Sequence, residues 1–164
     1  MTQKKAGGGR DALMAEMQGE ARRYMASYAL FNQAVADHLR LHPTDVQCLS
    51  LLSLEGEPVT IGRVAELTGL TTGSATRLVD RLERAGYVRR ERDAEDRRRV
   101  MVASVPEKAA ELGAFWRRLN RTWAELFDAY DDAGIALLTD YMRRTVDVSA
   151  AQVERLRSGE FDSD

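Results

Sequence analysis

Apolar side chains recur at alternating intervals of three and four residues along the first part of the chain. They are Met14, Met17, Ala21, Tyr24, Tyr28, Phe31 and Val35. This spacing predicts one long helix from about Asp11 to Leu39, with a single apolar seam along it. A helix of this length rarely finds enough partner surface inside so small a protein. We therefore favour packing against a second chain, with an intramolecular core as the alternative.

Two shorter helices follow, each with its own start and stop signals. "HPTDVQCLSLLSLEGEP" contains Thr44 and, three residues later, Gln47, which is a capping-box pattern. We expect a helix from Thr44 to about Leu54. Thr60 can cap the next helix, "IGRVAEL", and Gly69 can end it in a left-handed conformation.

A third short helix and two strands complete the middle of the chain. The helix "GSATRLVDRLERA" opens at Thr71 or Thr72, and Gly86 closes it. The segments "YVRR" and "RVMVAS" alternate in the manner of short strands. The charged run "ERDAEDRRRV" joins them, so the pattern predicts a β-hairpin with a charged tip.

The C-terminal part is predicted to form two long helices. Ser104 with Glu107 makes another capping box, and Pro106 suits a first helical turn. The apolar seam of the first helix is Leu112, Trp116, Leu119, Trp123, Leu126 and Tyr130. After a turn near "DDAG", the seam of the last helix is Ile135, Leu138, Met142, Val146, Val153 and Leu156. Three long helices at the ends therefore surround a compact α-α-β-β unit.

The net charge of −2 over 164 residues hides an asymmetry. Between Arg63 and Arg99 there are ten arginines against seven acidic residues, a local excess of +3. The rest of the chain therefore carries about −5, much of it beyond Glu125. Phosphate binding depends on local positive charge rather than on the total. The basic middle between acidic ends therefore indicates where a nucleic acid would bind.

Several classes of protein are disfavoured by what the sequence lacks. No stretch approaches eighteen uninterrupted apolar residues, and the basic start "MTQKKAGGGR" has no apolar core after it. We expect a cytoplasmic protein without a membrane segment. No phosphate loop, G-x-S-x-G or H-E-x-x-H motif occurs, so we expect no enzyme activity and no cofactor.

Three residues invite a chemical role that the surrounding sequence does not favour. Cys48 lies in the apolar helix "VQCLSLL", where a buried structural thiol is a better interpretation than a redox sensor. His38 and His42 have the i,i+4 spacing of metal ligands, but Pro43 marks a helix boundary beside them and no cysteine completes a cluster. We expect no metal site.

The segment "VTIGRVAELTGLTTGSATRLVDRLERAGY" has the pattern of a helix-turn-helix. Gly69 permits a sharp turn, and Ala65 is small where two helices approach closely. The buried side is Val64, Leu70, Ala75 and Leu78, and the second helix presents Thr72, Ser74, Arg77, Arg81 and Arg84 on another face. A major groove admits one such helix, whose short polar side chains can reach base edges. An αα-hairpin in an ordinary helical bundle is the alternative.

The hairpin after this helix favours DNA binding. A solvated loop is the simplest interpretation of "ERDAEDRRRV" by itself. After a recognition-type helix, a wing that reaches the minor groove explains it better, because the negative potential there attracts arginine. We predict a mainly α fold with a β-hairpin wing. Its segments are a disordered tail (1–10), an N-terminal dimerisation helix (11–42), a winged helix-turn-helix domain (43–105), C-terminal dimerisation helices (106–158) and a frayed tail (159–164).

Over nearly its whole length the sequence resembles the MarR family of bacterial winged-helix regulators. The most specific part is "DAEDRRRVMVASV", in which Asp96, Arg98 and Val102 match the acidic, arginine and β-branched positions of the family's wing. "LVDRLERAGYVRR" is similar to the family's recognition-helix end and first wing strand. The family's usual Leu-Thr after the wing is replaced by Ser104-Val105, and we expect Ser104 to cap the next helix.

The resemblance implies a role for each matching residue. Asp96 would pair with an arginine and brace the wing, while another arginine enters the DNA; whether Arg97 or Arg98 does so stays open. Asp93 and Glu95 are expected to be loop and solubility residues. The expected DNA contacts are Ser74 and Arg77 to bases, Thr71, Thr72, Thr76 and Arg81 to the backbone, and Arg89 and Arg90 to phosphates.

The resemblance also implies a homodimer of interlocked terminal helices that binds a near-palindromic operator. A small aromatic or phenolic effector would bind between the dimer helices and the DNA-binding lobe and release a repressor from double-stranded DNA. Tyr28, Phe31 and His38 are our candidates for that pocket, although aromatic residues at helical spacing are more often core or interface. The rival hypothesis is a winged-helix protein–protein interaction module whose wing binds an acidic partner.

Overall fold

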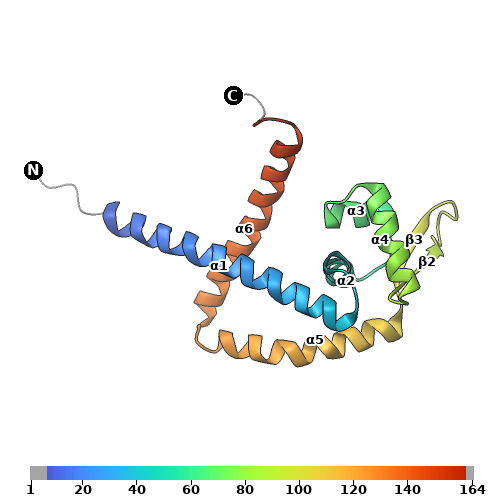
Figure 1. Cartoon of the computed structure of the whole chain (residues 1–164), viewed down its shortest axis with the longest axis horizontal. Helices are drawn as coiled ribbons and strands as arrows, with labels where there is room; N and C mark the ends of the chain where they lie inside the picture. Colours follow the sequence, from blue (N-terminus) through green and yellow to red (C-terminus); the bar gives the residue numbers. More distant parts are fainter. Residues whose placement is uncertain (1–6, 162–164) are drawn as a thin grey trace, which may run out of the picture. The chain divides into compact units, whose positions relative to one another are not determined.

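The protein is described by a computed structural model that covers residues 7–161. The chain divides into two compact units, Met1–Ala110 and Glu111–Asp164. The elements of the first unit are α1 (Gly7–Leu39), α2 (Pro43–Glu55), β1 (Val59–Thr60), α3 (Ile61–Thr68), α4 (Thr72–Arg84), β2 (Val88–Arg92) and β3 (Val100–Ser104) (Figure 1). α5 (Pro106–Phe127) crosses the boundary between the units, and α6 (Asp132–Arg157) lies in the second. The mainly helical fold with a β-hairpin wing is confirmed.

Helix α1 begins earlier than the apolar seam predicts. It starts at Gly7, so the predicted tail is wrong for residues 7–10, while residues 1–6 lie outside the described part. Once a helix has formed, each added residue gains a backbone hydrogen bond, which allows it to extend past the seam. At the other end Val35 and Ala36 are buried, because α1 packs against α2 there. The last turns of α1 therefore belong to the core of the first unit.

The N-cap of helix α2 lies two residues before the predicted cap, Thr44. His42 is the N-cap, and its Nδ1 accepts a hydrogen bond from the backbone N–H of Thr44 at 3.3 Å. The carboxylate of Asp45 accepts in return from the backbone N–H of His42 at 3.4 Å. The predicted Thr44–Gln47 capping box is therefore wrong. Pro43 explains the earlier start, since its fixed φ suits the first helical position.

The helix-turn-helix forms as its glycines and threonines predict. Thr60 and Thr71 are the N-caps of α3 and α4. Gly69 ends α3 with a φ of +69°, and the N–H of Leu70 closes the turn on the carbonyl of Ala65 at 3.1 Å. Gly86 follows α4 with a φ of +78°. Both helix ends are confirmed, because the signals that set them are local.

The wing belongs to a three-stranded antiparallel sheet in the order β1-β3-β2. Val88 pairs with Ser104 and Arg92 with Val100 across the hairpin, while β1 adds two residues along the other edge of β3. β1 was not predicted, since two residues show no alternation. Ser104 lies in β3 and α5 begins at Pro106, so the predicted Ser104 cap is wrong by one residue.

The core of the first unit lies between α4 and the elements around it. Its largest fully buried side chains are Leu78, Leu82, Val64, Val79, Val88, Val102 and Cys48. Three of them come from α4, which packs against α2, α3 and β2. The recognition-type helix is thus the centre of the first unit, and any shift of it would disturb most of the core.

The terminal helices have a different character. Neither α5 nor α6 contains a buried residue. Large apolar side chains are exposed along α5 and α6: Trp123, Leu126, Phe127, Ile135, Leu137, Tyr141, Met142, Val146, Val148, Val153 and Leu156. Within residues 7–161, no helix is long and apolar enough to cross a membrane.

A turn follows α6 directly after its C-cap, Ser158. Gly159 has a φ of +73°, and the guanidinium of Arg155 bonds the carboxylate of Glu160 at 2.7 Å. The same guanidinium lies 4.7 Å from the ring centroid of Phe161. Residues 159–161 thus lie beyond the helix, where the predicted tail begins, and residues 162–164 lie outside the described part.

Candidate nucleic-acid interface

The burial pattern of α4 decides which of its side chains reach solvent. Ala75, Leu78, Val79 and Leu82 are fully buried, and their three-and-four spacing places them on one face. The other face exposes Thr72, Gly73, Arg77 and Arg84. This face is polar and basic, as a helix that enters a major groove requires.

A short chain of hydrogen bonds orders the first two turns of α4. Thr71 accepts from the backbone N–H of Ser74 at 3.3 Å and donates its hydroxyl to the Ser74 hydroxyl at 3.1 Å. Arg77 donates to the same hydroxyl at 3.0 Å. Thr76 instead donates to the backbone carbonyl of Thr72 at 2.9 Å. The two predicted base-contacting residues, Ser74 and Arg77, are thus held together at the exposed end of α4.

Arg81 has a partner that sequence reasoning missed. Its Nη2 lies 2.5 Å from Oδ1 of Asp45 on α2, and its Nε donates to Oδ2 at 3.2 Å. The Asp45 side chain is 3% exposed and the Arg81 side chain 42%. The hydrogen bonds that Arg81 donates to Asp45 raise the pKa of Arg81 above its usual range. A residue predicted to hold DNA is bound to a buried acid of its own chain.

Arg90 is similarly engaged. From β2 its Nη2 lies 2.6 Å from Oδ1 of Asp80, its Nη1 bonds Glu83, and its backbone N–H donates to Glu83 at 3.0 Å. Arg89 precedes Arg90 on β2, so its side chain lies on the opposite face of the sheet. It is about half exposed, and its Nε lies 3.1 Å from the carboxylate of Glu91. Of the two predicted phosphate contacts, Arg90 joins the wing to α4, and Arg89 is the more accessible.

Asp93 organises the wing tip. Its Oδ1 accepts from the backbone N–H groups of Glu95 at 2.8 Å and Asp96 at 3.0 Å. These bonds, that of Asp96 first, lower the pKa of Asp93 below its usual range. The prediction that Asp93 is only a loop and solubility residue is wrong. An aspartate that bonds the backbone two and three residues ahead stabilises a turn.

Asp96 pairs with one of the two candidate arginines. Its Oδ1 accepts from both Nε and the backbone N–H of Arg98 at 3.1 Å, which lowers the pKa of Asp96. Arg98 remains 93% exposed. The neighbouring Arg97 makes no ion pair with a carboxylate within residues 7–161, while its carbonyl accepts from Nη1 of Arg92 at 3.2 Å.

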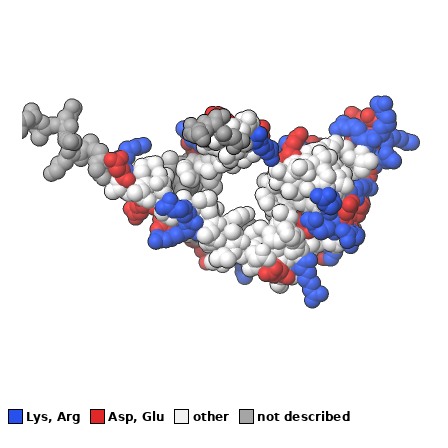
Figure 2. All heavy atoms as spheres, turned by 45° about the horizontal axis from the view of Figure 1, so that its top comes forward, with Lys and Arg blue, Asp and Glu red and all other residues white. Residues whose placement is uncertain are grey.

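The excess positive charge can now be located. Six of the ten arginines between Arg63 and Arg99 lie within 4.0 Å of a carboxylate: Arg63, Arg81, Arg89, Arg90, Arg98 and Arg99. The other four make no such pair within the part of the chain that the structure describes: Arg77, Arg84, Arg92 and Arg97. Basic and acidic side chains crowd together over the wing (Figure 2). The uncompensated charge thus lies on α4 and the wing.

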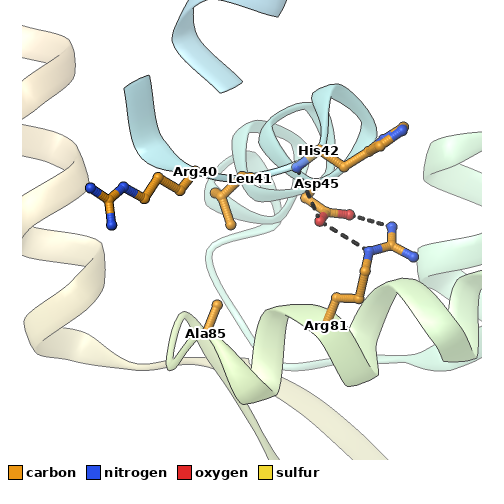
Figure 3. Close-up of a pocket in the computed structure, with 6 residues that line it drawn as sticks. All are labelled: Arg40, Leu41, His42, Asp45, Arg81 and Ala85. Carbon is orange, nitrogen blue, oxygen red and sulfur yellow. Dashed lines mark hydrogen bonds and ion pairs between the residues drawn. The ribbon is translucent and has the colours of Figure 1, made fainter. Parts of the chain in front are cut away.

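A cavity of about 380 Å³ lies between the α1–α2 turn, the start of α2 and the end of α4. It is lined by Arg40, Leu41, His42, Asp45, Arg81 and Ala85 (Figure 3). The predicted effector residues Tyr28, Phe31 and His38 lie further back along α1 and do not line it. Tyr28 is 56% exposed and Phe31 is half-buried. The structure therefore does not bring the three together around this cavity.

Cys48 is buried, as predicted, with 1% of its surface exposed. Burial, and secondarily the charge of Asp45, raise its pKa to about 12. The thiol is thus protonated at neutral pH and is a poor nucleophile. Among the described residues, no group of three His, Cys, Asp or Glu side chains is arranged to hold a metal ion.

Asp45, Asp80 and Glu83 were missed as partners of predicted DNA contacts. Asp45 and Arg81 are separated by 36 residues, and no spacing rule joins them. Asp80 and Glu83 are three residues apart and therefore neighbours on the surface of α4. This spacing was a weak sign that the two carboxylates could bind one cation together. The strand that brings Arg90 beside them depends on tertiary packing.

Comparison with known proteins places this geometry in a family. A family model described as the MarR family matches residues 41–99. The HTH-type transcriptional regulator YcgE of Bacillus subtilis (strain 168) is 38% identical over 128 residues, which is 78% of this chain and 82% of YcgE.

Solved structures of regulators share the fold. A MarR family protein from Bacillus stearothermophilus superimposes with a TM-score of 0.67 at 21% identity, covering 85% of this chain and 97% of its own. BldR from Sulfolobus solfataricus gives 0.60 at 26%, covering 89% and 99%. BpsR of Bordetella bronchiseptica, whose DNA binding 6-hydroxynicotinic acid regulates, gives 0.56 at 20%, covering 79% and 91%.

Proposed function

The chain belongs to the MarR family of DNA-binding transcriptional regulators, and we propose that it is a dimeric repressor released from a near-palindromic operator by a small molecule. The observation that carries the proposal is the location of uncompensated arginines. Arg77 and Arg84 lie on α4, and Arg92 and Arg97 lie on the wing. Phosphates would neutralise these four charges without breaking an existing ion pair.

In this proposal α4 enters the major groove. Ser74 and Arg77 contact base edges near the start of the helix, where arginine can donate two hydrogen bonds to a guanine. Thr71, Thr72 and Thr76 contact the DNA backbone and hold the helix in register. The Thr71–Ser74–Arg77 hydrogen bonds support this assignment, since side chains that are already ordered lose less entropy on binding.

The wing is proposed to reach the adjacent minor groove through Arg97. Arg98 is bonded to Asp96 and would brace the tip, whereas Arg97 pairs with no carboxylate among residues 7–161. Arg89 is proposed to contact a phosphate. Arg81 and Arg90 are proposed to hold α4 in place instead of contacting DNA, because both bond carboxylates of the first unit.

Dimerisation is proposed to cover the exposed apolar side chains of the terminal helices. Soluble monomers rarely expose apolar patches larger than a few hundred Å² (~300–600 Å² for the largest patch). Two-fold pairing of identical faces would bury them and would present two copies of α4. The operator would then contain two half-sites about one helical turn apart.

Release by an effector is the remaining part of the proposal. A small aromatic or phenolic acid would bind between the dimer helices and the DNA-binding lobe, and would favour a dimer whose recognition helices no longer match the half-sites. Tyr28, Phe31 and His38 on α1 remain our candidates for its contacts. The regulation of BpsR by 6-hydroxynicotinic acid is a precedent within the same fold. A thermal-shift screen followed by a DNA-release assay identifies the ligand.

The experiment for DNA binding starts with the purified full chain. The protein is used to select a DNA duplex from a random-sequence library. Its binding to that duplex and to a shuffled duplex is then titrated over a range of salt concentrations. A regulator gives a palindromic consensus, nanomolar affinity and a steep salt dependence, with the shuffled duplex bound at least about 1,000-fold more weakly.

The rival module predicts a different result. A wing that binds an acidic protein would retain DNA only through charge, so both duplexes would bind with similar affinity. No consensus after selection, together with equal binding of the two duplexes, would remove the DNA-binding part of the proposal. Weakened binding of both duplexes by Arg97→Ala would support the placement of the wing.

A further inference from the structure

The ion pair between Asp45 and Arg81 joins α2 to the recognition helix. Among the residues that the structure describes, Asp45 is the one charged residue that is buried, with 2% of its surface exposed. Three hydrogen-bond donors face its carboxylate: Nη2 of Arg81 at 2.5 Å, Nε of Arg81 at 3.2 Å and the backbone N–H of His42 at 3.4 Å (Figure 3). One buried carboxylate therefore connects the α1–α2 turn, α2 and α4.

We propose that Asp45 and Arg81 are a positioning pair that sets the rotation of α4 and thereby its specificity, without contacting DNA. The inference rests on the proposed DNA-binding function and names residues that control it. It replaces the role that the sequence predicted for Arg81, a direct contact with the DNA backbone.

The chemistry of the pair explains why its geometry is specific. A buried carboxylate is costly unless it is matched by a cation and by hydrogen bonds. The planar guanidinium meets the carboxylate through two nitrogen atoms, and this bidentate arrangement has one favourable orientation. Turning α4 would separate these atoms and leave Asp45 buried without its partner.

The apolar contacts of α4 oppose a large shift of the helix, but they fix its rotation less sharply than the ion pair does. The side chains of Leu78, Val79 and Leu82 are buried, but dispersion and burial have no preferred direction. Arg90 adds a second ionic contact to the same half of α4, through Asp80 and Glu83, but it does so from the wing, which is a short hairpin. Asp45 lies on α2 within the core, so its pair with Arg81 is the link from α4 to a rigid element.

A small rotation of α4 would affect specific binding more than general binding. Side chains extend about 5–6 Å from a helix axis, so a rotation of roughly 10° moves their tips by about 1 Å. Ser74 and Arg77 precede Arg81 by seven and four residues, so they move with it. A shift of about 1 Å exceeds the tolerance of a hydrogen bond to a base edge. Contacts between flexible arginines and phosphates adjust to such a shift.

The cavity beside the pair leaves space for this movement. Leu41 and Ala85 line it together with the two charged residues, and Figure 3 shows Arg40 directed away from the pair. On this side a small rotation of α4 would meet open space once the pair is broken. The ion pair therefore holds the helix beside a gap that packing leaves open.

Asp45→Asn separates positioning from direct contact. The variant keeps the shape of the side chain, removes a negative charge and releases the Arg81 guanidinium. If Arg81 contacted a phosphate, its release would leave DNA affinity unchanged or raise it for every sequence. Positioning predicts that specific affinity falls by about tenfold while affinity for shuffled DNA stays the same.

The experiment compares wild type, Asp45→Asn, Arg81→Gln and the double variant on the selected and shuffled duplexes over a range of salt. Two controls accompany them. Glu55→Gln breaks an ion pair between α2 and Arg63, and Val64→Ala weakens the core without touching an ion pair. Thermal unfolding of each variant reports stability, so that losses of affinity are compared at equal stability.

A positioning pair gives equal losses of specific affinity in both single variants and in the double variant, since either change removes the same contact. The slope of affinity against salt stays that of the wild type, because no phosphate contact is lost. Arg81→Lys keeps the charge but cannot make the bidentate contact, so it also loses specific affinity. This variant carries the test even where Asp45→Asn does not fold.

Two results would overturn the inference. A lower salt slope in Arg81→Gln, with Asp45→Asn and Arg81→Lys binding as wild type, would make Arg81 a phosphate contact. A loss in Asp45→Asn no larger than in Val64→Ala at equal stability would leave the pair a structural role alone. Failure of the proposed function is a separate observation, because the wild-type protein itself would then not distinguish the two duplexes.

Discussion

The winged part of the molecule (residues 35–104) and the terminal helices α5 and α6 differ in how they cover their apolar side chains. Every buried hydrophobic residue of the described chain lies between Val35 and Ala103. α5 and α6 are long and amphipathic but contain no buried residue. Contacts within one chain therefore stabilise the winged part. The apolar faces of the terminal helices would gain stability if another apolar surface covered them.

The difference also separates two tasks. The winged part holds α4 through its core and through the pairs of Arg81 and Arg90, so the chemistry of the interface is fixed within one chain. The spacing between two such interfaces would depend on the terminal helices. A ligand that changes how those helices pair could alter DNA affinity without touching α4.

The largest effect is expected from the core of the winged part. Leu78→Ala should lower the free energy of unfolding by about 2–5 kcal/mol, because Leu78 is fully buried and the cavity cannot collapse completely. Leu54→Ala is the matched control, since Leu54 is 81% exposed on α2 and should change stability by about 0.5 kcal/mol or less. Chemical unfolding of both variants measures the difference, and equal midpoints would contradict the assignment of α4 to the core.

A second prediction tests the terminal helices. Met142 and Val146 are 53% and 67% exposed on α6. Replacing both with Glu should leave the winged part folded and raise the dimer dissociation constant by roughly 10- to 100-fold, because carboxylates would be buried without partners. Arg143→Glu adds the same charge on another side of α6 and should dissociate the dimer less. Sedimentation that gives the same constant for both would locate the dimer contact elsewhere.

The wing supplies the third prediction. Arg97→Ala should weaken binding to every DNA sequence by about tenfold and reduce the salt slope by about one, since it removes a cation that pairs with no carboxylate in the described part of the chain. Arg98→Ala should lose less affinity, because Arg98 is already bonded to Asp96. Titration of both variants on one duplex decides between them. A larger loss in Arg98→Ala would exchange the two roles.

A smaller effect is expected at the turn that leads from α4 into the wing. Gly86 has a φ of +78° and nothing within 4 Å of an added Cβ, so Gly86→Ala should cost about 1 kcal/mol through the backbone alone. Gly73 is helical and equally unobstructed, so Gly73→Ala should stabilise α4 by about 0.5–1 kcal/mol. Thermal unfolding gives both signs, and a shared sign would be incompatible with the left-handed turn.

The smallest effect is expected at Cys48. Because burial raises its pKa to about 12, the native thiol should resist thiol reagents at pH 8 and react only on unfolding. The folded pKa lies above the unfolded value of about 8.5. The stability that the protonated Cys48 thiol contributes is thus complete below the unfolded pKa, and it is lost as the pH rises toward the folded pKa of about 12. Rapid labelling of the native protein would place the thiol at the surface.

The two regions also differ in how far the sequence predicted them. Gly69, Thr71 and Gly86 marked the ends of α3 and α4, because caps and left-handed turns depend on a few neighbouring residues. The seams of α5 and α6 were visible for the same reason, since helical periodicity is local.

Contacts between distant segments were not predicted. Asp45 and Arg81 are 36 residues apart, and their pairing depends on how α2 packs against α4. The start of α2 was misjudged because His42 and Pro43 compete with Thr44 as start signals within the same few residues. The wing tip was predicted in outline, but the bonds from Asp93 to the backbone required its actual turn.

In the proposed dimer, the exposed apolar faces of the terminal helices pair two copies of a self-sufficient winged part, and both operator symmetry and release by a ligand depend on this pairing. Sedimentation of the wild-type chain at micromolar concentration tests it, alone and with the selected duplex. We expect a single species of twice 18.4 kDa, and one such dimer on each duplex. A species of 18.4 kDa, alone or on DNA, would contradict the claim.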